Sequence, residues 1–123
     1  MCHLGIGLPF AFASSLFYLI REFSDVTVVL AHCGTMDNEA ECILLAKEFP
    51  NVYLETSVRT PNQKNLKKFV KEVGSERVMY ASDSPDEMAH CVWEVRNCGF
   101  SEKQVEDILW KTAAKAFNIA DKI

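Results

Sequence analysis

Three short apolar runs recur along this sequence at a constant interval, and they constrain its fold more than any other feature. The runs begin at Val26, Val52 and Val78, which are 26 residues apart, and each ends in small or polar residues. Runs this short and this apolar are typical of strands buried on both faces, as in a parallel sheet. The carboxyl ends of parallel strands lie on one edge, where α/β proteins hold their chemistry. The sequence therefore predicts a repeated βα unit with candidate functional residues on one edge.

Segments with helical periodicity alternate with the predicted strands. Gly74 fits a left-handed helix end, Ser84 can cap a helix that has Pro85 in its first turn, and Ser101 forms a capping box with Gln104. We expect helices over residues 10–23, 35–49, 60–73, 85–98 and 101–116.

Length and composition narrow the class of protein. The 123 residues correspond to one α/β domain spanning 1–123, and the net charge of −4 predicts no nucleic acid partner. Five scattered cysteines, an odd number, favour reduced thiols and a cytoplasmic location over a disulfide framework. Residues 1–20 contain no Lys, Arg, Asp or Glu, but Gly5, Gly7 and Pro9 interrupt them, so no membrane span or targeting segment is expected.

His3, His32 and Asp83 each lie where a strand is expected to end. Two imidazoles and a carboxylate are ligand types that a divalent metal such as zinc takes, and parallel strands would bring them to one edge. Each residue also has a simpler interpretation. Asp83 could cap a helix, His32 could be a hydrogen-bonded core histidine, and His3 lies so near the terminus that it could lack a fixed position.

Four segments carry a resemblance to a known family. In chain order they read FSDVTVVLAHCG, FPNVYLETS, ERVMYASDSP and GFSEKQVEDILWKTAAKAFNI. Together they resemble the C-terminal half of the amidohydrolase-related branch of the amidohydrolase superfamily, which includes aminocarboxymuconate-semialdehyde decarboxylase. The resemblance covers nearly the whole chain from Phe23 onward, and it implies half of a (β/α)8 TIM barrel, with parallel strands 5–8, their helices and a C-terminal helix.

The resemblance also implies an activity and a set of roles. Enzymes of this family are metal-dependent hydrolases or decarboxylases that act on small-molecule substrates through a metal-activated water. By position, His3 resembles the strand 5 metal ligand and His32 the strand 6 histidine that acts as acid/base. Asp83 resembles the strand 8 aspartate, which is both a metal ligand and a catalytic residue. A divalent metal, with zinc as the first expectation, is therefore implied.

The sequence departs from the family pattern in ways that leave alternatives open. The family's H-x-H ligand pair occurs nowhere in this sequence, and Lys111-Thr112 stands where the family usually carries Gly-Asn. A complete barrel takes about 250 residues, so this sequence matches roughly half of one. The alternative function is therefore a non-catalytic α/β interaction or structural module. A third reading, an open flavodoxin-like sheet, lacks a glycine-rich phosphate loop after any strand.

Half of a barrel would have exposed strand edges. It would leave the strand at His3 and the strand at Val78 unpaired on one side, and it would uncover inward-facing apolar residues within Val26–Leu30, Val52–Leu54 and Val78–Tyr80. We therefore expect a homodimer or a partner that supplies the N-terminal half of a barrel.

Overall fold

The computed structural model describes residues 1–5, 11–35, 38–57 and 63–119. Within these residues, four strands form one parallel sheet in the order β1-β2-β3-β4. The strands are β1 (Cys2–His3), β2 (Val28–Ala31), β3 (Val52–Glu55) and β4 (Val78–Met79). This order follows the chain without reversing, as in a barrel, whereas a doubly wound sheet reverses at a switch point. The flavodoxin-like alternative is therefore wrong, and the half-barrel fold is confirmed.

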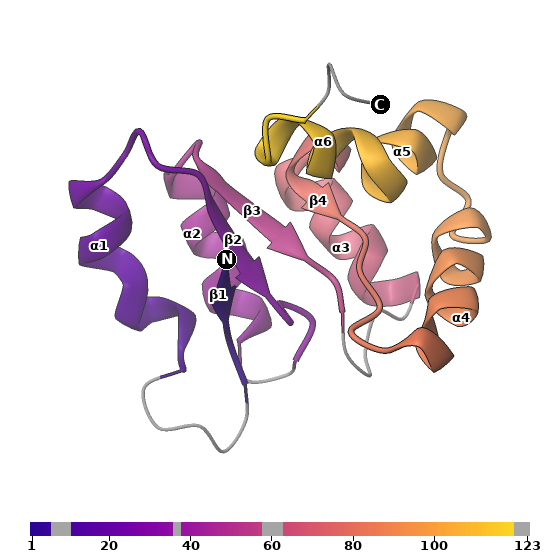
Figure 1. Ribbon diagram of the computed structural model, residues 1–123, viewed down its shortest axis with the longest axis horizontal. Coiled ribbons are helices and arrows are strands. Elements are labelled where there is room, and N and C mark those ends of the chain that lie inside the picture. Colours follow the sequence, from indigo (N-terminus) through magenta and orange to yellow (C-terminus); the bar gives the residue numbers. More distant parts are fainter. Residues whose placement is uncertain (6–10, 36–37, 58–62, 120–123) are drawn as a thin grey trace.

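Helices connect and follow the strands (Figure 1). Between β1 and β2 lie η1 (Ala13–Leu16) and α1 (Phe17–Glu22), and between β2 and β3 lies α2 (Glu39–Glu48). Between β3 and β4 lie α3 (Gln63–Val73) and η2 (Ser75–Arg77). After β4 lie α4 (Pro85–Arg96), α5 (Glu102–Glu106), the π-helical turn η3 (Asp107–Lys111) and α6 (Thr112–Ala116). We call residues 102–116 the C-terminal helix. No helix in the described part of the chain is long and apolar enough to cross a membrane.

The local helix signals are mostly confirmed. Gly74 has a φ of 85°, and the Ser101 side chain accepts a hydrogen bond from the Gln104 backbone N–H in the predicted capping box. Ser84 does occupy the N-cap position before Pro85, but its side chain makes no capping hydrogen bond. Parts of the helices predicted over 10–23, 35–49 and 60–73 fall on residues 10, 36–37 and 60–62, which lie outside the described residues.

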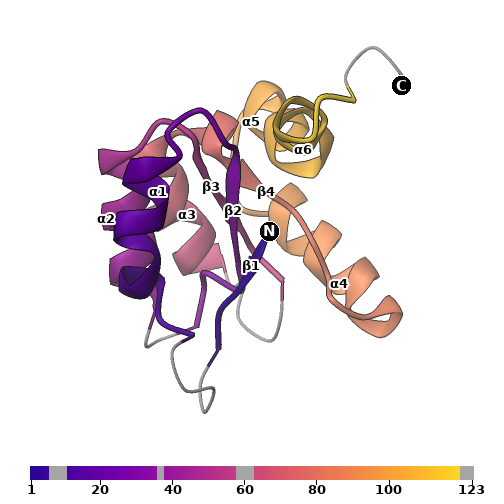
Figure 2. The same cartoon turned by 60° about the vertical axis from the view of Figure 1, so that its left-hand side comes forward.

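The two faces of the sheet are covered by different helices. Side chains such as Leu30, Leu54 and Val78 point to the face covered by α1, α2 and α3, where the main core lies. Val29, Tyr53 and Met79 point to the opposite face. Figure 2 shows α1–α3 on one side of the sheet and the C-terminal helix on the other.

The expectation that the inward face would be uncovered is wrong for its central residues. Val29, Tyr53 and Met79 are only 1%, 7% and 2% exposed. Ala113 and Ala116 of the C-terminal helix pack against them, because small side chains let the helix approach the strands closely. The single chain therefore buries these inward-facing residues by itself.

Hydrogen bonds hold the C-terminal helix in this position. The Tyr80 backbone N–H donates to the Ile108 carbonyl at 2.7 Å, and the Thr112 hydroxyl donates to the Ser75 carbonyl at 3.1 Å. The buried Asp107 carboxylate accepts from the Ser75 hydroxyl at 2.7 Å and from Lys103 Nζ at 2.6 Å. Thr112, one of the two departures from the family's Gly-Asn, thus ties the helix to η2, directly before β4.

The Asp107 contacts predict an acid-sensitive contribution to stability. Burial alone raises the pKa of Asp107, but the hydrogen bonds from Lys103 and Ser75 outweigh it and hold the pKa below its ordinary value. Stabilisation by the ionised group is therefore complete above the unfolded pKa of about 4 and is lost as the pH falls through the folded pKa. Asp107→Asn should be less stable than wild type at pH 7, and this difference should narrow below about pH 4. Urea unfolding between pH 7 and pH 3 tests this, and a difference that stays constant would contradict it.

Arg77 joins β3 to the end of α2. Its Nη2 donates to the carbonyls of Ala46 and Phe49 at 3.0 and 2.7 Å, and its Nε donates to the Val52 carbonyl at 2.9 Å. Its guanidinium also lies over the Tyr53 ring, 5.3 Å from the centroid. One side chain therefore satisfies carbonyls at a helix end that have no partner within the helix.

Removing this guanidinium should destabilise the fold. Arg77→Met leaves the Ala46 and Phe49 carbonyls without their donor, so the free energy of unfolding should fall by about 1–3 kcal/mol. Arg96→Met, at an exposed position of α4, is the matched control and should change it by less than about 0.5 kcal/mol. Urea denaturation measures both, and equal effects of the two substitutions would contradict the role of Arg77.

Candidate active site

A pocket of about 290 Å³ opens at the carboxyl edge of the sheet. All three residues singled out in the sequence line it, His3 from the end of β1, His32 from just after β2, and Asp83 from the segment after β4. The predicted common edge is therefore present in the structure. The lining residues are Met1, His3, Ala31, His32, Glu55, Ser57, Ala81 and Asp83.

Two of the pocket residues have unusual backbone geometry. His32 has a φ of 62° and Asp83 a φ of 63°, and among the described residues other than glycine only Asn118 shares this left-handed conformation. Such residues are uncommon and concentrate at functional sites, where the surrounding structure holds them in place. Here the left-handed turn directs the chain away from the sheet at the point where each of these two residues lines the pocket.

The His32 ring is held from both sides. It is buried, and its Nε2 lies 3.0 Å from Nδ1 of His3, with the two rings edge to face at a centroid distance of 4.5 Å. Its Nδ1 lies 2.8 Å from the Ser57 hydroxyl. His32 is therefore more than a core histidine, because one ring nitrogen contacts His3, which lines the pocket, and the other contacts the buried Ser57 hydroxyl.

A buried carboxylate that sequence reasoning missed lies behind His32. Glu55 is 2% exposed, and its Oε2 accepts from the His32 backbone N–H at 3.1 Å and from the Ser57 hydroxyl at 2.8 Å. Its Oε1 accepts from the Ser57 backbone N–H at 2.5 Å. One signal in the sequence was available. Alternation along β3 puts Glu55 on the same face as Tyr53, and a carboxylate inside so apolar a strand needs buried partners.

The described residues provide only part of a metal site. Imidazole and carboxylate donors suit a divalent metal, and His3 and Asp83 are exposed enough to reach one. However, no group of three or more His, Cys, Asp or Glu side chains in the described part of the chain is placed to hold a metal ion. The contact between His3 and His32 is close, but Asp83 does not complete a set with them.

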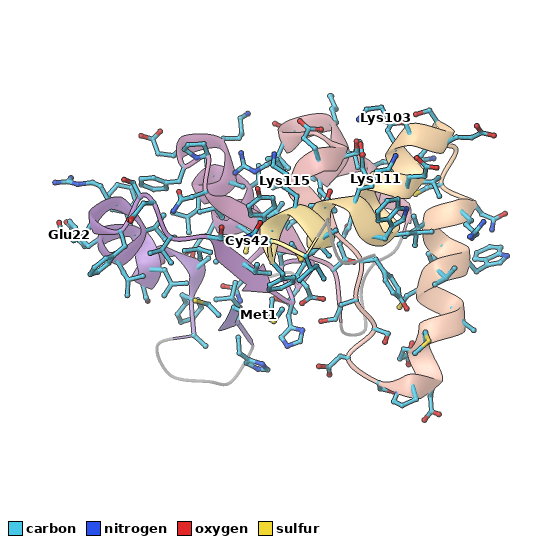
Figure 3. The ribbon with its side chains drawn as sticks, turned by 45° about the horizontal axis from the view of Figure 1, so that its top comes forward. Met1, Glu22, Cys42, Lys103, Lys111 and Lys115 are labelled. Atoms are coloured by element: carbon cyan, nitrogen blue, oxygen red, sulfur yellow. The ribbon has the colours of Figure 1, made fainter. Side chains whose placement is uncertain are left out.

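The cysteines do not contribute to the site. All five are thiols and none forms a disulfide, as expected from their odd number and scatter. Cys33 directly follows His32, but burial raises its pKa well above the ordinary value. Burial also raises the pKa of Cys42 to about 12; this fully buried residue is labelled in Figure 3. Neither thiol is suited to act as a nucleophile near neutral pH.

Burial predicts an order of thiol reactivity. At pH 8 the folded protein should be alkylated first at the partly exposed Cys2, while Cys33 and Cys42 should react at least about 100-fold more slowly, since they are buried and protonated. After unfolding without reductant, all five cysteines should be modified. Mass spectrometry of digested, alkylated protein measures both stages. Rapid native labelling of Cys33 would contradict this.

Comparisons with known proteins agree with this architecture. The model of a protein family described as Amidohydrolase matches residues 16–119. A comparison with curated proteins finds no match. Among solved structures, a candidate metal-dependent hydrolase from Lactobacillus casei has a TM-score of 0.76 at 20% identity, covering 98% of this chain and 39% of its own.

Two further solved structures contain bound metal. A dihydroxybenzoic acid decarboxylase from Polaromonas, with manganese and the inhibitor 2-nitroresorcinol, has a TM-score of 0.68 at 19% identity over 88% of this chain and 39% of its own. An amidohydrolase from Burkholderia multivorans, with zinc, has a TM-score of 0.64 at 17% identity over 86% of this chain and 49% of its own. The chain thus spans about two fifths to one half of the length of these structures.

Proposed function

Since this chain belongs to the amidohydrolase family, we propose that it carries one side of the active site of a metal-dependent hydrolase or decarboxylase. The observation that supports this most is the pocket that His3, His32 and Asp83 share, with His32 fixed in a left-handed backbone conformation. We propose a small-molecule substrate, because structural neighbours such as the dihydroxybenzoic acid decarboxylase are named for small-molecule substrates.

Each residue has a distinct role in this proposal. His3 and Asp83 would hold a divalent metal, which would supply a Lewis acid and lower the pKa of a bound water to about 7. His32 acts as the acid/base that exchanges a proton with the reacting group. Zinc is our first choice of metal, and the neighbours with manganese and with zinc support a divalent ion in general.

The metal site needs further donors from outside the described residues, because zinc sites in enzymes use three protein ligands. We propose that a partner supplies them, either a second copy of this chain or a polypeptide with the remaining strands of the barrel. Among the described residues, β1 and β4 each pair with one neighbour only, so each offers an edge for such a strand. We expect no nucleic acid or membrane partner, and the reduced thiols support a cytoplasmic location.

A non-catalytic α/β interaction or structural module remains the alternative. The observation that favours it is the lack of three metal donors in one place within the described part of the chain. Such a module would keep the sheet and the buried core but would bind no metal at His3 and Asp83.

Metal titration tests the proposed site. We expect Zn²⁺ and Mn²⁺ to bind the purified protein, and His3→Ala and Asp83→Asn each to weaken binding at least about 10-fold by removing a donor. His90→Ala and Asp86→Asn, at exposed positions of α4, are the matched controls and should bind as wild type does. Isothermal titration gives the affinities, and native mass spectrometry gives the number of ions per chain.

The same protein preparations also test for a second copy of the chain and for the non-catalytic alternative. Sedimentation equilibrium over a range of protein concentration, with and without metal, distinguishes a homodimer from a single chain. Metal that binds equally well to wild type, His3→Ala and Asp83→Asn would reject the proposed ligands. A protein that binds neither ion at any concentration would favour the non-catalytic module for the isolated chain.

A further inference from the structure

We infer that Glu55, acting through the Ser57 hydroxyl, fixes the tautomer of His32 so that Nδ1 carries the proton and Nε2 presents its lone pair to His3. Glu55 and Ser57 are therefore positioning residues, and neither needs to touch the substrate. The use of His32 in chemistry rests on the proposed function, whereas its tautomer follows from the hydrogen bonds alone.

The direction of each hydrogen bond follows from counting protons. The Ser57 hydroxyl oxygen lies 2.8 Å from Glu55 Oε2 and 2.8 Å from His32 Nδ1, but it has only one proton to donate. An ionised carboxylate can only accept, so the hydroxyl proton points to Glu55. The same oxygen must then accept from His32 Nδ1, which therefore carries the ring proton. In the neutral ring, Nε2 is left with a lone pair.

The contacts of Glu55 fit an ionised carboxylate. Two of its donors are the backbone N–H groups of His32 and Ser57, which can only donate, and the third is the Ser57 hydroxyl. One of these N–H groups follows β2 and the other follows β3, so the carboxylate is fixed relative to both strands. His32, Glu55 and Ser57 are all buried, and bulk water does not compete for these hydrogen bonds.

The hydrogen bonds from Glu55 through Ser57 to His32, which we call the relay, continue from His32 Nε2 to His3. Since His32 Nε2 bears a lone pair, the 3.0 Å contact is a hydrogen bond donated by His3 Nδ1–H. The second nitrogen of His3, Nε2, then has its own lone pair available to a metal ion. A single buried carboxylate thereby sets the protonation pattern of both histidines in the pocket.

Nuclear magnetic resonance of the metal-free protein tests the tautomer directly. Long-range ¹H–¹⁵N spectra of protein labelled with ¹⁵N-histidine distinguish a protonated from an unprotonated ring nitrogen, and His3→Gln and His90→Gln assign the signals. Near pH 8.5, where an ordinary imidazole is neutral, wild-type His32 should have its proton on Nδ1. Ser57→Ala and Glu55→Gln should each shift the signals toward a mixture of the two tautomers.

Thr56→Val is the matched control for the variants. The Thr56 hydroxyl is also buried and lies between the two residues in sequence, but it donates to the Met79 carbonyl and does not contact His32. This substitution should cost similar stability and leave the His32 tautomer unchanged. Ser57→Thr, which keeps a hydroxyl, should retain the Nδ1–H form. The wild-type spectrum alone remains decisive if Ser57→Ala or Glu55→Gln does not fold.

The outcomes separate this inference from the proposed function. A wild-type His32 with its proton on Nε2, or an unchanged Nδ1–H signature in Ser57→Ala, overturns the relay even if the protein binds metal. A wild-type Nδ1–H signature that is lost in Ser57→Ala supports the relay, whatever the metal-binding results are. If His3→Ala and Asp83→Asn leave metal binding unaffected, only the proposed metal site is rejected.

Discussion

Parallel pairing of each strand with the next determines where the functional side chains of this structure lie. The backbone hydrogen bonds align Cys2 with Leu30, Val28 with Val52 and Leu54 with Val78. Because all strands point the same way, the residues that follow them leave the sheet at one edge. A shift of one residue between β2 and β3 would turn the Glu55 side chain to the opposite face and separate it from His32. The site therefore depends on register as much as on residue type.

Much of this arrangement could be predicted from the sequence, because short apolar runs and turn residues are local signals. The strands near Val28, Val52 and Val78, the capping box at Ser101 and the placement of His32 and Asp83 at one edge all follow from such signals. Their roles in catalysis and metal binding do not follow from position, and they stay predictions.

Other features depend on contacts between distant segments and could not be predicted in the same way. The apolar stripe of the C-terminal helix indicates that Ala113 and Ala116 are packed, but not that they cover Val29 and Tyr53 on the inward face of the sheet. The relay from Glu55 to His32 needs the register between β2 and β3, which their similar apolar patterns do not specify. In both cases, the residue types alone allowed several packing or hydrogen-bonding partners.

The long separation in sequence between paired strands affects how the chain folds during synthesis. Val28 pairs with Val52 and Leu54 with Val78, so each of these contacts joins residues 24 positions apart, and the described sheet contains no hairpin. A high proportion of such distant contacts slows folding, since each must close a long loop first. At synthesis rates of about 5–20 residues per second, each new strand follows its predecessor from the ribosome by roughly one to five seconds. During that interval the preceding strand has an open edge, and chaperones that shield apolar segments would find β2 and β3 accessible.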